Sequence, residues 1–133
     1  MPTPTLRLRI DFGRDCAVGP GKIALLEHID TSGSLSQAAR DLNMSYRRAW
    51  QLLESLNRSF RERVVVTSRG GRGGGGAVLT PFGQALIGSF RRFESDMQAR
   101  ARRHFGVLSR AARQSRVHSK DHGAPVIRLS ERR

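Results

Sequence analysis

The residues whose types and spacing could do chemistry lie in the segment SYRRAWQ, residues 45–51. Arg47 and Gln51 stand four positions apart, so on a helix both side chains leave the same face. Arginine and glutamine form paired hydrogen bonds with the edges of guanine and adenine in the major groove of DNA. The segment therefore predicts a surface that reads bases. Trp50 leaves two interpretations open, a DNA contact or a partly buried packing residue, and the second is favoured because large aromatic side chains are mostly buried.

A second candidate is the glycine-rich segment SRGGRGGGGAVLT, residues 68–80. It contains the spacing G-x-G-x-x-G, which in a dinucleotide site follows a strand and opens a helix. RVVVT, residues 63–67, could supply the strand, but AVLT and Pro81 follow the glycines instead of a helix, and no Gly-Lys-Ser/Thr is present. The pattern favours a β-hairpin whose flexible tip carries Arg69 and Arg72 to a phosphate backbone or minor groove.

Composition points to an anionic partner and to one domain. The chain has 133 residues, 24 Lys and Arg against 11 Asp and Glu, and a net charge of +13. Only Lys22 and Lys120 are lysines, and the arginine fork suits phosphate and guanine. A solvated basic face without a partner is the alternative on charge alone.

Catalytic and metal chemistry find little support in the residue types. No nucleophile–base pair or carboxylate dyad stands out. Cys16 is the single cysteine and is expected to be a buried thiol. Of the four histidines only His118 and His122 have i, i+4 spacing, and they fall in a polar tail. We expect no enzyme, no metal and no cofactor.

The chain shows no signal for a membrane. No apolar run approaches the ~18 residues of a membrane span, and the N-terminus lacks the apolar centre of a signal peptide. We expect a cytoplasmic protein.

Three short elements must position residues 45–51. LRLRIDF, residues 6–12, alternates apolar and polar residues and predicts a half-buried strand, and residues 22–31 predict a helix. Ser34 and Gln37 have the spacing of a capping box, in which Ser34 accepts from the Gln37 amide and Gln37 reaches back. Apolar residues then follow at i, i+3, i+4 and i+7: Leu35, Ala38, Ala39 and Leu42.

A third helix is expected from its cap, Ser45, to about Phe60. Its inner face is Ala49, Leu53, Leu56 and Phe60. Asn43, before it, is expected to take a left-handed conformation. Two short helices joined by so tight a turn predict a helix-turn-helix, with an ordinary helical hairpin as the alternative. With the glycine hairpin behind it, the motif becomes a winged helix.

A long helix is predicted from its cap, Thr80, and Pro81 to about residue 105. Its apolar stripe is Phe82, Leu86, Phe90, Phe93 and Met97. The stripe either packs entirely on its own domain or partly meets the same stripe of a second chain. The second arrangement is favoured, because exposed apolar stripes of this size usually mark an interface. Residues 106–133 are expected to be a disordered basic tail.

The segment SLSQAARDLNMSYRRAWQLLESL, residues 34–56, resembles the helix-turn-helix of the LysR superfamily. With LRLRIDFG before it and GGRGGGGAVLTPFG after it, the chain resembles the N-terminal domain of ModE-type molybdenum-responsive transcriptional regulators over about residues 6–97. The resemblance implies a homodimer that binds palindromic operators and regulates molybdate uptake or molybdoenzyme genes. In that family C-terminal small β-barrels bind the oxyanion. The ~30 residues after the long helix are too few for such a barrel, so molybdate sensing by this chain is not expected and its effector stays unknown.

Taken together, these features predict a mainly α fold with small β: a winged helix-turn-helix over residues 1–105 with a dimerisation helix at about 80–105. The predicted function is a dimeric, sequence-specific transcriptional regulator, linked by the resemblance to molybdenum metabolism, that reads an inverted repeat with helix 45–60 and the wing at 63–80. A nucleoid-type architectural DNA-binding protein is the main alternative, and an RNA-associated protein and an enzyme are weaker ones. The predicted DNA-binding residues are Ser34, Ser36, Ser45, Tyr46, Arg47, Arg48, Trp50, Gln51, Arg69 and Arg72.

Overall fold

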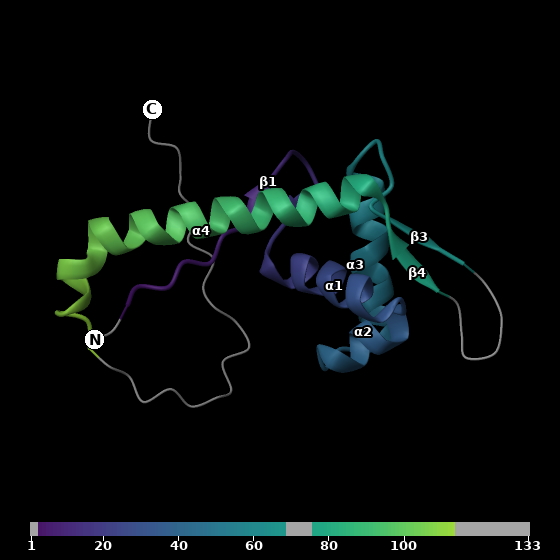
Figure 1. The fold of residues 1–133 in the computed structure, drawn as a ribbon, viewed down its shortest axis with the longest axis horizontal. Helices are drawn as coiled ribbons and strands as arrows, with labels where there is room; N and C mark the ends of the chain where they lie inside the picture. Colours follow the sequence, from purple (N-terminus) through teal and green to yellow (C-terminus); the bar gives the residue numbers. More distant parts are fainter. Residues whose placement is uncertain (1–2, 69–75, 114–133) are drawn as a thin grey trace.

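Three short helices and two small hairpins form the body of the protein, and one long helix runs across it (Figure 1). The computed structural model describes residues 3–68 and 76–113. The helices are α1 (Pro20–Ser32), α2 (Leu35–Asp41), α3 (Tyr46–Ser59) and α4 (Pro81–Ser109). The antiparallel hairpins join β1 (Ile10–Asp11) to β2 (Ala17–Val18) and β3 (Val65–Thr67) to β4 (Ala77–Leu79). The order of elements confirms the mainly helical fold, with a helix-turn-helix followed by a hairpin and a long helix.

The core lies where α1, α2 and α3 meet beneath α4. Helices α2 and α3 bury most of their predicted inner faces, while Leu42 and Phe60 of those faces are half-buried. The buried side chains are Ile23, Leu25, Leu26 and Ile29 of α1, Leu35, Ala38 and Ala39 of α2, and Ala49, Leu53 and Leu56 of α3. Because Ala38 and Ala39 are small and fully or almost fully buried, α2 can pack closely against α1 and α3.

The helix starts form as predicted, with one exception. Ser45 Oγ accepts from the Arg48 amide at 3.0 Å, Thr80 Oγ1 accepts from the Gly83 amide at 3.0 Å, and Asn43 has a left-handed φ of 54°. The capping box at Ser34 is only half formed. Ser34 Oγ accepts from the Gln37 amide at 3.2 Å, but the Gln37 side chain turns outward to Arg40 and Asp41. The Ser34 amide is already satisfied by Ser32 Oγ, so nothing draws Gln37 back.

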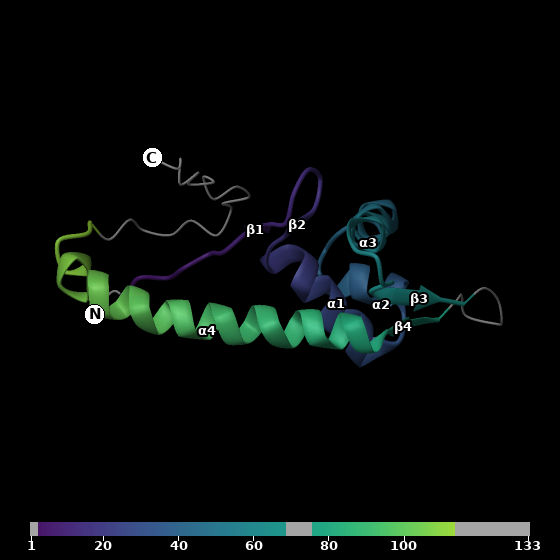
Figure 2. The same cartoon turned by 90° about the horizontal axis from the view of Figure 1, so that it is seen from above.

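The N-terminal strand is much shorter than predicted. Only Ile10 and Asp11 pair with β2, whereas a strand was expected over residues 6–12. Buried and exposed side chains still alternate in the residues that precede β1, where Leu6 and Leu8 are half-buried and Arg7 is exposed. There the extended chain runs along α4 (Figure 2), and the Gln98 side chain accepts from the Leu6 amide at 2.8 Å and donates to the Pro4 carbonyl. The carboxamide of Gln98 thus bonds to the backbone of this segment in place of a partner strand.

Helix α4 is longer than predicted and is tied to α1. It ends at Ser109 rather than near residue 105, so residues 106–109 of the expected tail are helical, while residues 114–133 lie outside the described residues. Gly106 costs helix stability on the order of 1 kcal/mol, too little to end the helix. Near its middle, Arg91 donates to Glu27 of α1 at 2.5 Å and to Glu94 at 2.7 Å. These carboxylates raise the pKa of Arg91 and keep it charged.

Candidate nucleic-acid interface

The outer face of α3 presents the predicted base-reading side chains to solvent. Arg47, Arg48 and Gln51 are exposed, while the opposite face, built on Ala49 and Leu53, is buried. Within residues 3–68 and 76–113, no carboxylate lies within ion-pair distance of Arg47 or Arg48. Their guanidinium groups are therefore available to an anionic or base-edge partner.

Two aromatic residues flank this face. Tyr46 is exposed, and Trp50 is exposed over 46% of its surface. The ring of Trp50 thus lies at the margin of the face and not within the core. Large exposed aromatics on a charged surface are suited to stacking against sugars or bases.

Three predicted serines lie at the starts of α2 and α3. The hydroxyl oxygens of Ser34 and Ser45 accept the capping hydrogen bonds, which leaves each hydroxyl proton free to donate. Ser36 is half-buried in the first turn of α2. These positions suit donation to phosphate oxygens rather than reading of bases.

The second hairpin stands next to α3, as a wing would (Figure 1). Val65 pairs with Leu79 and Thr67 with Ala77, and Val65, Ala77 and Leu79 are buried against the body. Arg69 and Arg72, the predicted tip cations, lie outside the described residues. The structure therefore establishes the base of the wing.

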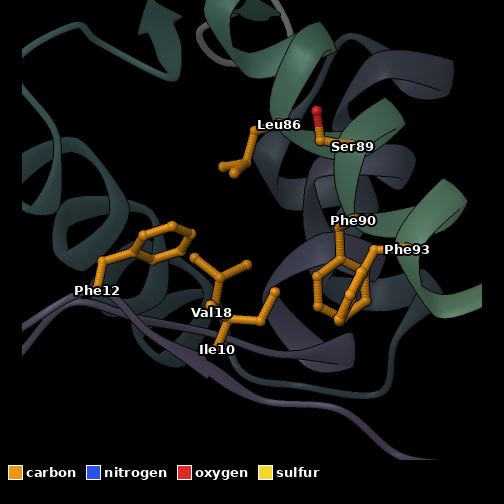
Figure 3. A pocket seen from close by; sticks show the side chains of 7 residues that line it. All are labelled: Ile10, Phe12, Val18, Leu86, Ser89, Phe90 and Phe93. Carbon is orange, nitrogen blue, oxygen red and sulfur yellow. The ribbon is translucent and has the colours of Figure 1, made fainter. Parts of the chain in front are cut away.

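The apolar stripe of α4 divides into an inner and an outer part. Leu86 and Phe90 face the first hairpin and line a cavity of about 200 Å³ (Figure 3). Phe90 is 3% exposed, and the Phe82 ring lies edge-on to Phe60 with centroids 5.2 Å apart, so both pack in the chain's own core. Phe93, at the rim of the cavity, is 42% exposed. The stripe thus packs mainly on its own domain, and Phe93 is its most exposed side chain.

Further apolar side chains are exposed beyond the stripe. Among them are Phe12 at the other rim of the cavity, Val66 and Val78 of the second hairpin, and Phe105, Val107 and Leu108 at the far end of α4. That end of α4 also carries Arg100, Arg102 and Arg103, all exposed.

Two polar residues that the sequence analysis passed over hold backbone segments in place. They are Asn57 of α3, bonded to the start of β3, and Gln98 of α4, bonded to the N-terminal segment. Each is a single carboxamide without a motif around it, so the sequence carries no signal for its contact.

The described residues offer neither a metal site nor a membrane span. Across residues 3–68 and 76–113, no three His, Cys, Asp or Glu side chains gather as a metal site would need. No described helix is both long and apolar enough to cross a membrane. Cys16 is buried, and its thiol lies 3.4 Å from the Ser59 carbonyl.

Comparison with known proteins shows which bacterial proteins this part of the chain is similar to. Residues 21–84 match the bacterial regulatory helix-turn-helix model of the lysR family. The chain is 48% identical over 68 residues to the DNA-binding transcriptional dual regulator ModE of Escherichia coli, which covers 51% of this chain and 26% of that protein. It is 41% identical over 78 residues to the molybdenum-pterin-binding protein MopB of Rhodobacter capsulatus, which covers 59% of this chain and 29% of that protein. With the molybdenum transport protein ModE of Azotobacter vinelandii it shares 34% identity over 93 residues, 70% of this chain and 34% of that protein. The chain therefore spans about a quarter to a third of the length of these relatives.

Proposed function

We propose that this chain, which carries a LysR-type helix-turn-helix domain homologous to the N-terminal portion of the ModE and Mop proteins, is a dimeric transcriptional regulator that reads an inverted-repeat operator. The observation that carries the proposal is the outer face of α3. It holds Arg47 and Gln51 one turn apart, exposed, near the start of the helix that follows the turn. In helix-turn-helix proteins the N-terminal residues of that helix are the ones that reach base edges.

Each remaining contact has a role that follows from its position. Arg48 and Tyr46 flank the reading pair, and Trp50 borders it. The serines Ser34, Ser36 and Ser45 donate to the phosphate backbone from the helix starts. Arg69 and Arg72, assigned from the sequence, bring the wing tip to a neighbouring phosphate or minor groove, beside the hairpin base that stands next to α3.

Dimerisation is supported by the apolar surface that α4 and the first hairpin leave open. The dimer residues that we propose are Phe93, which is exposed, and Leu86 and Met97, which are half-buried, whereas Phe82 and Phe90 of the expected stripe pack in the chain's own core. Phe93 contributes the most accessible surface, and a second chain that covers it would also close the cavity shared with Phe12. Two recognition helices fixed by a two-fold axis need half-sites about 34 Å apart, or a multiple of this distance.

The relatives' names connect this domain with molybdenum, and we propose that the regulated genes serve molybdenum uptake or use. DNA binding would place the chain in the cytoplasm. Genome-wide mapping of bound fragments, compared between molybdenum-replete and molybdenum-starved cells, tests this link, and bound sites unrelated to molybdenum genes would reject it.

The central test is sequence selection from a random DNA pool. The wild-type chain should enrich an inverted repeat, and Arg47→Ala should lose ~1–3 kcal/mol on it while relaxing the preference at particular positions. Arg102→Ala removes the same charge at the far end of α4 and serves as the matched control, with the preference unchanged. An equal loss on every sequence would make Arg47 a phosphate contact. Failure to enrich any sequence, with equal affinity for all duplexes, would instead indicate an architectural protein.

A further inference from the structure

Asn57 occupies the last turn of α3 and makes three hydrogen bonds to the start of the wing. Its Oδ1 accepts from the amide of Val64 at 2.8 Å and from the amide of Val65 at 3.2 Å. Its Nδ2 donates to the carbonyl of Val65 at 3.2 Å. Only the oxygen of a carboxamide accepts, so the two amides fix which way the Asn57 group faces.

The register of the wing explains why the backbone groups of Val65 need Asn57, while the N–H of Val64, which precedes β3, donates to the Asn57 side chain rather than to β4. The Thr80 amide donates to the Val64 carbonyl at 3.0 Å and the Ser68 amide to the Gly76 carbonyl at 2.9 Å. Backbone groups of an antiparallel pair point alternately toward and away from the partner strand. Val65, one residue out of this phase, therefore turns its N–H and C=O away from β4. The Asn57 carboxamide satisfies both, as a neighbouring strand would.

Burial makes this contact consequential. The residues Val64 and Val65 are 0% and 1% exposed. Buried backbone N–H groups are almost always hydrogen-bonded, because an unpaired one loses its hydration without compensation. Among the described residues, Asn57 is the side chain that accepts hydrogen bonds from the amides of Val64 and Val65.

The opposite edge of the wing is held as well. The Ala77 amide of β4 donates to the Gly33 carbonyl at 3.0 Å, in the turn between α1 and α2. Asn57 holds the outer edge of β3 from α3. The base of the hairpin is thus fixed between the two sides of the helix-turn-helix.

We infer that Asn57 is the positioning residue that sets the angle between α3 and the wing, so that both meet the same DNA duplex. The inference rests on the proposed function, since it assumes that α3 and the wing both touch DNA. A wing whose base could pivot would lose orientational freedom on binding, and a pre-set angle avoids that cost. Asn57 acts through Val64 and Val65 and needs no DNA contact of its own.

The first experiment measures the contact without DNA. Amide exchange followed by NMR should show that Asn57→Ala removes the protection of the Val64 and Val65 amides. The Val66 amide, in phase with β4, should keep its protection. Ile23→Val, which trims a fully buried side chain of α1, is the control for general loss of stability. Equal loss at Val64, Val65 and Val66, or no loss at all, would overturn the inference.

The second experiment is a double-mutant cycle on DNA, with the tightest duplex that the wild-type chain selects from a random pool as the probe. Residues 69–75 are replaced by Asn-Gly, a two-residue turn that suits the hydrogen-bonded pair Ser68 and Gly76. With the natural wing, Asn57→Ala should weaken binding about tenfold and flatten its salt dependence. In the shortened wing, the same substitution should weaken binding less than about twofold. Ile23→Val should leave the salt dependence of either form unchanged.

The outcomes separate the two claims. If shortening the wing leaves affinity and salt dependence as they were, the wing contact in the proposed function fails, and the positioning role fails with it. If shortening weakens binding but Asn57→Ala has the same effect in both backgrounds, only the positioning role fails.

Discussion

A methyl group added at Gly83 should destabilise the fold, although Gly83 lies in a helix where alanine is normally preferred. A Cβ at this position would lie 2.3 Å from the Val64 carbonyl oxygen and 3.3 Å from Val64 Cγ1. That carbonyl cannot simply retreat, because it accepts a hydrogen bond from the Thr80 amide at 3.0 Å. Gly83 is therefore the point at which α4 touches the base of the wing.

The magnitude follows from three contributions. Overpacking a tight site costs about 1–3 kcal/mol, and weakening one hydrogen bond to Val64 costs about 1 kcal/mol. Replacing glycine in a helix returns up to about 1 kcal/mol. Gly83→Ala should thus lower the free energy of unfolding by about 1–3 kcal/mol.

Gly88 in the same helix offers a matched control. A Cβ there meets only the end of the flexible Arg92 side chain, at 3.2 Å. Gly88→Ala should therefore stabilise by about 0.5–1 kcal/mol. Thermal unfolding at equal protein concentration should place the two variants on opposite sides of the wild type, with midpoints separated by roughly 5 °C or more. A Gly83→Ala chain that melts at or above the wild-type temperature would refute the close contact with Val64.

Three further predictions concern the DNA complex. Replacing Arg69 and Arg72 together by alanine should weaken binding on all sequences and reduce the slope of log affinity against log salt by up to about two, and an unchanged slope would remove the wing from the interface. Phe93→Asp should sediment as a monomer that keeps only weak, charge-driven binding, while Val78→Asp, which places the same charge on an exposed apolar site of β4, should stay dimeric. A monomeric wild type at micromolar concentration would contradict the dimer. Inserting about five base pairs at the centre of the operator should abolish specific binding by turning one half-site to the wrong face, and tolerance of that insertion would reject the fixed spacing.

The helix-turn-helix could be predicted from the sequence because its signals are local. Residues three and four apart decide which face of α2 or α3 is buried, and Ser45 and Asn43 mark where helices begin and end through their own backbone or the next turn. The exposed face of α3 follows from the same periodicity, since burying Ala49 and Leu53 leaves Arg47 and Gln51 outside. The same pattern in the sequence therefore predicts both the helix-turn-helix and the exposed face of α3.

What could not be predicted depends on partners distant in the chain. Leu6 finds its hydrogen-bond partner 92 residues away, in Gln98, so its alternating segment looked like a strand but pairs with a side chain instead. The sequence marks Gly83 as a cost to helix stability and contains no sign that Val64 approaches it. Likewise, Phe82 and Phe90 have the spacing of an interface stripe, yet both side chains pack in the core of their own chain.

These long-range contacts converge on one end of the recognition helix. Phe60, just after α3, stacks edge-on with Phe12 of the first hairpin at 5.5 Å and with Phe82 of α4 at 5.2 Å. The Cys16 thiol of that hairpin donates to the Ser59 carbonyl at 3.4 Å, and Asn57 holds the wing. The C-terminal end of α3 is thus fixed to three elements, while its first turns remain open to solvent. A helix clamped at one end presents its free end at an angle set by the clamp. Phe12, one of the rings of this clamp, also lines the cavity on which we propose that a second chain packs, so the anchored end of each recognition helix would adjoin the dimer surface.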